Sequence, residues 1–142
     1  MTDPAQYTDE MVMFRRSFHS HPETGWTEFR TTSIIVNRLK ELGLTVLQGT
    51  RVINPDFVMG RYPDEVEAGK KRALSEGVSQ EDIDATEGYT GAVAIFDTGR
   101  QGPVSAFRFD IDALYIPETT NPTHLPNQLG FASRHPGLMH AC

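Results

Sequence analysis

Apolar residues recur at the spacing of a helix face in two stretches near the start of the chain. In the first stretch the positions i, i+3 and i+7 are occupied by Met11, Phe14 and Phe18. They predict an amphipathic helix over residues 9–18, which ends before Pro22 because a proline disfavours helical geometry in the preceding residue. In the second stretch a similar face is formed by Ile35, Leu39 and Leu42. It predicts a helix that starts near residue 26 and is followed directly by Gly43.

Three short apolar runs have the length and flanking residues of β-strands. Residues 44–47 lie close to glycines on both sides, which is typical of a buried strand. Residues 92–96 and 104–109 are separated by a segment rich in glycine and proline, so they predict a strand, a turn and a second strand. Trp26 and the phenylalanines are expected in the core.

Residues 49–89 differ from the segments on either side in their glycines, prolines and charged residues. The charged part predicts a helix over residues 64–76, with Glu67 and Lys71 as an i, i+4 ion pair. Ser79, with an acidic residue three positions later, resembles a capping box and predicts a second short helix. We expect a surface insertion of one or two helices without chemistry of its own, because runs of charge usually mark a solvated face.

Residues 117–136 contain four prolines and few apolar residues, which predicts a loop. A loop of this length in a compact domain needs an external reason to be ordered, and a nearby active site would supply one. Upstream of this loop, the run 104–109 leads into Asp110 and Asp112. In open α/β sheets, ligands collect outside the carboxyl ends of strands, so both carboxylates are candidates for a site.

Composition places the chain among ordinary globular proteins. It has 142 residues, of which 38% are hydrophobic and 23% are charged, enough for one domain with a core. The net charge of -6 is spread along the chain without a basic stripe, which argues against a nucleic-acid partner. The first residues are acidic and polar and the apolar runs are short, so we expect neither a signal peptide nor a membrane span. A single cysteine requires no oxidising compartment, and we expect a cytoplasmic location.

The single cysteine, Cys142, stands two residues after His140 and downstream of Asp110 and Asp112. Thiolate, imidazole and carboxylate groups all bind divalent transition metals. A structural zinc site takes four protein ligands and a catalytic one usually three, so one Cys and one His do not complete a site. We therefore expect the chain to end inside a metal site and not after it.

Each candidate also has an explanation without chemistry. Asp110 and Asp112 could cap the next turn, and Cys142 could be a reduced core thiol. The remaining histidines have no spacing typical of ligands and are expected on the surface or in hydrogen bonds: His19, His21, His124 and His135. Spacing alone predicts an α/β domain and leaves a partial metal site as one of two interpretations.

Several motifs, in this order along the chain, resemble those of a known superfamily. They are residues 15–31, 90–91, 102–103, 107–114 and 137–142, the last of which reads Gly-Leu-Met-His-Ala-Cys. Together they resemble the metal-dependent amidohydrolases of the dinuclear carboxypeptidase and aminoacylase superfamily. Within that superfamily, the chain resembles the p-aminobenzoyl-glutamate hydrolases in particular, at residues 52–54, 59–65 and 130–133. The match runs from about residue 10 to the last residue.

The resemblance implies an α/β fold, the N-terminal portion of a mixed-sheet, zinc-peptidase-like catalytic domain with flanking helices. Residues 1–142 would form this portion, with a helical insertion at about 49–89, while the dimerisation domain and the rest of the catalytic domain would be absent. The implied activity is hydrolysis of the amide bond in p-aminobenzoyl-glutamate, a folate breakdown product, or in related N-acyl amino acids. The implied cofactor is two divalent metal ions, Mn or Zn, which this chain alone should bind weakly or not at all. We expect the isolated chain to be inactive.

The resemblance also implies roles for individual residues. In the family the His-Ala-Cys motif continues into Gly-His-Asp, so Cys142 is implied to be a metal ligand and His140 a neighbour that does not coordinate. Asp112 stands at the aspartate that orients the site without binding metal itself. Asp110 stands where related carboxypeptidases have a histidine ligand, and its role stays open. The general-base glutamate is expected beyond residue 142. A structural role is implied for the motif formed by His19, Pro22 and Glu23.

The implied partners are a small-molecule N-acyl amino acid substrate, the missing C-terminal part of the enzyme, and a B subunit or further copies of the chain. Two other functions stay open. The chain could be a non-catalytic, stand-alone α/β binding module derived from this fold, which a cooperative unfolding transition would favour. It could instead use Cys142 as a nucleophile beside His140, which we rank last because a terminal residue is a poor place to hold a nucleophile rigid.

Overall fold

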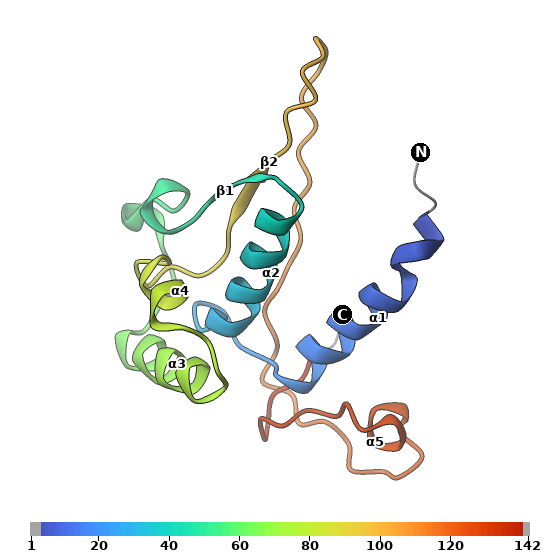
Figure 1. Cartoon of the computed structure of the whole chain (residues 1–142). Helices are drawn as coiled ribbons and strands as arrows, with labels where there is room; N and C mark the ends of the chain where they lie inside the picture. The colour runs from blue at the N-terminus through green and yellow to red at the C-terminus, as the bar shows by residue number, and fades with distance from the viewer. Residues whose placement is uncertain (1–3, 141–142) are drawn as a thin grey trace. The chain divides into compact units, whose positions relative to one another are not determined.

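The structure is a computed structural model that describes residues 4–140 of the chain. It divides into two compact units, unit 1 with residues up to 24 and from 112 onward, and unit 2 with residues 25–111. Both helices and short strands are present, which confirms the predicted mixed α/β class (Figure 1). Over the described range, no helix is long and apolar enough to cross a membrane.

The first helix of unit 2, α2, spans Phe29–Glu41 and confirms the second helix predicted from the sequence. It ends where the sequence places Gly43, whose φ of 78° lies in the left-handed region that glycine adopts without strain. The amide of Leu44 then donates to the carbonyl of Leu39 at 3.1 Å, which satisfies one of the last carbonyls of the helix.

The predicted insertion contains two α-helices, α3 (Pro63–Ser75) and α4 (Gln80–Asp84). The Ser79 hydroxyl accepts the Asp82 amide at 3.0 Å, so the predicted N-cap is confirmed. The predicted partner of Glu67 was wrong, because its carboxylate pairs with Lys70 at 2.7 Å and not with Lys71. Both spacings bring side chains together on a helix, and sequence alone does not decide between them.

The core of unit 2 lies between α2 and this insertion. Its buried cluster consists of Phe29, Val66, Ala73 and Ile83, with Trp26 and Val78 packed against it. Three of the four buried side chains come from α3 and α4, and both helices contact α2. The interpretation of this segment as a solvated elaboration therefore holds for its outer face only, since its inner face builds the core.

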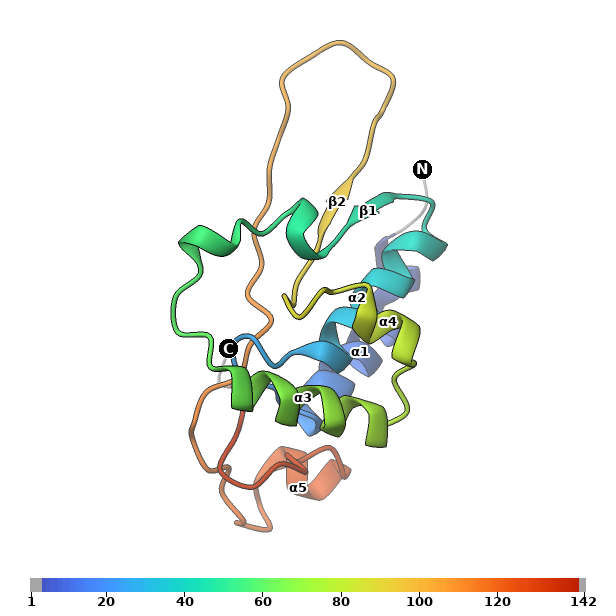
Figure 2. The same cartoon turned by 90° about the vertical axis from the view of Figure 1, so that its left-hand side faces the viewer.

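The strands of unit 2 are β1 (Thr45–Leu47) and β2 (Val93–Ile95), which pair antiparallel with Thr45 opposite Ile95. They confirm two predicted strands, although β1 is only half-buried and β2 is exposed. The third predicted strand was wrong. Residues 104–109 pair with no described strand, and Figure 2 shows the chain after β2 running outward and returning as an open loop.

The physical reason lies in the surroundings of residues 104–109. A strand needs neighbours that accept its backbone hydrogen bonds and cover its apolar side chains. Here Val104 is 97% exposed, Phe107 81% and Phe109 80%. The prediction that the phenylalanines lie in the core is therefore wrong for Phe107 and Phe109, and also for Phe57 and Phe96.

Unit 1 starts with a 3-10 turn (Pro4–Tyr7) and the helix α1 (Thr8–Ser20), which confirms the first predicted helix. Phe14 and Phe18 stack with their ring centroids 6.1 Å apart on the predicted face. The same unit contains the proline-rich loop, in which the sequence analysis missed a short helix, α5 (Leu125–Leu129).

Candidate functional site

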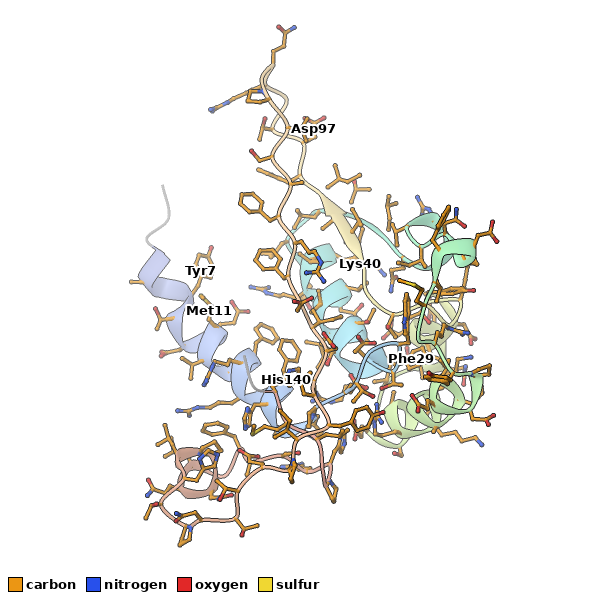
Figure 3. The ribbon with its side chains drawn as sticks, turned by 180° about the vertical axis from the view of Figure 1, so that it is seen from behind. Tyr7, Met11, Phe29, Lys40, Asp97 and His140 are labelled. Carbon is orange, nitrogen blue, oxygen red and sulfur yellow. The ribbon has the colours of Figure 1, made fainter. Side chains whose placement is uncertain are left out.

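Unit 1 brings together two candidate segments that are far apart in the sequence. The backbones of Leu114 and Met139 exchange two hydrogen bonds, at 3.0 and 3.1 Å, in an isolated antiparallel bridge. On the other side, the Ala113 amide donates to the Glu23 carbonyl at 2.7 Å. Asp112 and His140 flank these paired residues, so the structure places both in one region. Figure 3 labels His140 beside the C-terminal half of α1.

The surroundings of His140 keep its imidazole neutral. Burial lowers its pKa below the ordinary 6.5, and the electrostatic effect of the nearby His19 lowers it further. The carboxylate and backbone of Asp112 act in the opposite direction but do not cancel these effects. The Nε2 atom of His140 is buried and has no hydrogen-bond partner among residues 4–140. A buried polar nitrogen of this kind is unusual in a folded protein.

The other predicted site residues are Asp112, Asp110 and Cys142. Asp112 has an exposed side chain. Asp110 belongs to unit 2 and forms an ion pair with Arg108 at 2.6 Å, in which both side chains are largely exposed, so the pair contributes little to stability. Cys142 lies outside the described residues. The roles assigned to these residues and to His140 stay predictions.

Within residues 4–140, no three His, Cys, Asp or Glu side chains converge in a way that could hold a metal ion. One candidate ligand follows His140 in the sequence, the thiol of Cys142. Thiolate is among the ligands that zinc and related divalent ions use. For His140 and Asp112 the prediction stays that they lie near the ligands without binding metal themselves.

Sequence reasoning missed a hydrogen-bonded carboxylate in unit 1. Glu118 has a side chain that is only 6% exposed. Its Oε1 accepts from the Nε2 atoms of His19 and His124, each at 2.8 Å, and its Oε2 accepts the Ser133 amide at 2.5 Å. His19 lies 99 residues away in the sequence, so no local spacing could have revealed this cluster.

The hydrogen bonds determine the charge of Glu118. Burial alone would raise the pKa of its carboxyl, but the Ser133 amide and the two imidazoles lower it below the usual range. Glu118 is therefore ionised at neutral pH. Because an ionised carboxylate only accepts hydrogen bonds, His19 and His124 must both donate from Nε2.

The same loop is fixed to α1 by further contacts. The Phe131 ring packs edge-on against His19 at 5.6 Å and lies under the Arg16 guanidinium at 5.1 Å. The Arg134 amide donates to the Ser20 carbonyl at 3.0 Å, and His135 Nδ1 donates to the Pro22 carbonyl at 2.6 Å. The predicted loop is therefore ordered by packing and hydrogen bonds within unit 1.

The chain is similar in sequence to curated proteins that are named as hydrolases, which agrees with the family resemblance seen in the sequence. It is 45% identical over 135 residues to a homolog of one subunit of p-aminobenzoyl-glutamate hydrolase from Haemophilus influenzae, a match that covers 94% of this chain and 32% of that protein. It is 43% identical over 140 residues to an indole-3-acetyl-aspartic acid hydrolase from Enterobacter agglomerans, covering 96% of this chain and 32% of the relative.

A solved structure supports the same relationship. The crystal structure of an aminobenzoyl-glutamate utilization protein from Klebsiella pneumoniae matches with a TM-score of 0.73 and 40% identity, over 78% of this chain and 28% of that one. No family model matches the chain. The chain spans about one third of the length of the relatives it matches.

Proposed function

We propose that this chain is the N-terminal portion of a dinuclear metal-dependent amidohydrolase that cleaves p-aminobenzoyl-glutamate or a related N-acyl amino acid. The observation that supports this most strongly is 45% identity to the p-aminobenzoyl-glutamate hydrolase homolog from Haemophilus influenzae over 94% of the chain. The pairing of Leu114 with Met139 adds to it, because it places the segments of Asp112 and His140 next to each other in one unit.

In this proposal Cys142 is a metal ligand, Asp112 orients the site without binding metal, and His140 is a neutral neighbour. Two divalent ions, Mn or Zn, would lower the pKa of a bound water and polarise the scissile carbonyl. The proposal also treats residues 49–89 as an insertion into the catalytic domain, and it assigns no role to Asp110.

The catalytic general base and the remaining ligands are expected in the two thirds of the relatives that this chain does not match. The isolated chain should therefore bind metal weakly or not at all and should be inactive. Partners of the complete enzyme would be its C-terminal part, a B subunit or a second copy, and the place of action would be the cytoplasm, in folate catabolism.

The decisive experiment replaces the matched segment of the Haemophilus influenzae relative by this chain. We call the product the replacement protein. With added Mn²⁺ it is expected to release p-aminobenzoate from p-aminobenzoyl-glutamate, whereas the isolated chain releases none. Indole-3-acetyl-aspartate, tested in parallel, distinguishes the two acyl groups that the relatives' names indicate.

Two variants give the test its contrast. In the replacement protein, Cys142→Ser should abolish activity because it removes a ligand, and Asp112→Asn should lower it by roughly ten- to hundredfold, as for other residues that orient metal ligands. A folded replacement protein without amidase activity would contradict the proposal. So would amide hydrolysis by the isolated chain. Cooperative unfolding of an inactive isolated chain, together with an inactive replacement protein, would favour a stand-alone binding module.

A further inference from the structure

The carboxylate of Glu118 joins three separate segments of unit 1 by hydrogen bonds. Glu118 is not among the expected metal ligands and has no role in the expected reaction. Glu118 accepts hydrogen bonds from three residues: His19 in α1, His124 just before α5, and the backbone amide of Ser133 in the segment after α5. The first two bonds end on Oε1 and the third on Oε2. Both carboxylate oxygens are therefore engaged.

This arrangement closes the loop formed by residues 117–136. The bond to Ser133 joins the start of the loop to its far part across 15 residues, and the bond to His124 ties in its middle. The bond to His19 fixes all of these to α1. Hydrogen bonds to a charged group are stronger than those between neutral groups, so one ionised carboxylate can order the whole loop.

The ordered loop leads directly to the candidate site. After Ser133, the chain is held to α1 and the turn that follows it by the Arg134 amide on the Ser20 carbonyl and by His135 on the Pro22 carbonyl. The Leu138 amide then donates to the His135 carbonyl at 3.1 Å, and the Met139 pairing with Leu114 follows. Each of these hydrogen bonds fixes a part of the chain from which the next residue can reach its own partner.

We propose that Glu118 is a positioning residue of the site, whose ionised carboxylate holds the loop on α1 and thereby keeps Met139 and His140 against the segment that carries Asp112. The inference rests on the proposed function only in taking the residues after Met139 as the metal-binding end. Glu118 itself is not expected to touch substrate or metal.

The first test measures amide hydrogen exchange in the isolated 142-residue chain. Glu118→Gln keeps the size of the side chain but removes its charge, and exchange at Ser133 should accelerate roughly ten- to hundredfold. The proposal requires a similar acceleration at Arg134 and Met139. Asp9→Asn, which removes one exposed charge from the same unit, is the control and should change neither. Unchanged exchange at Met139 in Glu118→Gln would overturn the proposal.

A milder pair of variants covers the case in which Glu118→Gln does not fold. His124 is 31% exposed in its side chain, so its replacement is better tolerated. His124→Leu removes one donor and should accelerate exchange at Ser133 and Met139, while His124→Gln can still donate an N–H and should restore protection. Equal exchange at Met139 in the two variants would contradict the positioning role.

The second test uses the replacement protein and measures how much Mn²⁺ its activity requires. Glu118→Gln should raise the Mn²⁺ concentration needed for half-maximal activity by roughly tenfold or more, as loss of a residue that orients ligands does, with Asp9→Asn unchanged. An active variant with an unaltered Mn²⁺ requirement would overturn the inference. An inactive parent replacement protein would instead contradict the proposed function, and exchange at Met139 would still decide the role of Glu118.

Discussion

Gly69 on α3 is the position at which a single added methyl group should disturb the core of unit 2. A Cβ at residue 69 would lie 2.9 Å from the Cβ of Thr27 and 3.2 Å from both its Cα and its carbonyl oxygen. These atoms are fixed by the backbone and cannot move aside as a flexible side-chain end can. The same carbonyl accepts the Phe29 amide at 2.9 Å and the Arg72 guanidinium at 3.0 Å, so any shift of Thr27 also disturbs these bonds.

Two opposing effects determine the result of Gly69→Ala. Helix propensity favours alanine over glycine by about 1 kcal/mol in a helix interior. Overpacking a filled site costs roughly 1 to 3 kcal/mol, and contact with backbone-held atoms places this case in the upper half of that range. We therefore expect a net loss of about 1 to 2 kcal/mol in the free energy of unfolding.

The assay is urea unfolding followed by far-UV circular dichroism. The matched control is Ala68→Gly, at the exposed neighbouring position, which isolates the propensity effect and should cost about 1 kcal/mol. If Gly69→Ala is as stable as the wild type or more stable, while Ala68→Gly shows its expected loss, the close approach of α3 to Thr27 is refuted.

Three further predictions concern capping, charge and exposed apolar surface. Ser79→Ala removes the acceptor of the Asp82 amide and should lower the free energy of unfolding by about 1 kcal/mol in the same urea assay; no change would mean that the cap contributes nothing. Because the folded-state pKa of Glu118 is lowered, its stabilising contribution is present above the unfolded-state pKa of about 4.3 and is lost as the pH falls through the folded value. The wild type should therefore lose more stability than Glu118→Gln when the pH is lowered from neutral through this range, and equal losses in urea midpoints would contradict this. The double variant Phe107→Ser, Phe109→Ser should reduce self-association in sedimentation without lowering stability, since both rings are at least 80% exposed; a stability loss would show that they pack in the folded chain.

Elements whose causes are local could be predicted from the sequence. Gly43 ends α2 because glycine adopts a left-handed conformation there, and Ser79 starts α4 because its hydroxyl reaches an amide three residues on. The helical spacing of Phe14 and Phe18 predicted α1 for a similar reason, because their rings stack on one face of the helix. In each case the deciding contact lies within one or two turns of helix.

Elements whose causes are distant could not be predicted. Residues 104–109 have strand-like sequence, but a strand also requires neighbours, and the described chain provides none for them. The surface assignment of the insertion failed for its inner face because the burial of Val66 depends on Phe29, far away in the sequence.

The candidate site shows the same division. The sequence alone made Asp112, His140 and Cys142 candidates, the family resemblance implied their roles, and the structure adds that Leu114 pairs with Met139. Glu118 was missed because its partners His19 and Ser133 lie 99 and 15 residues away. Hydrogen bonds over such separations leave no periodic pattern in the sequence.

The central claim is that this chain supplies part of a dinuclear metal site through Cys142. The most direct test is the number of divalent metal ions bound per molecule of the replacement protein, measured by elemental analysis after equilibration with Mn²⁺ or Zn²⁺ and removal of free metal. We predict two ions per molecule with Cys142 present and fewer than two in Cys142→Ser, with Asp9→Asn unchanged. Equal metal content with and without the thiol would contradict the assignment of Cys142 as a ligand.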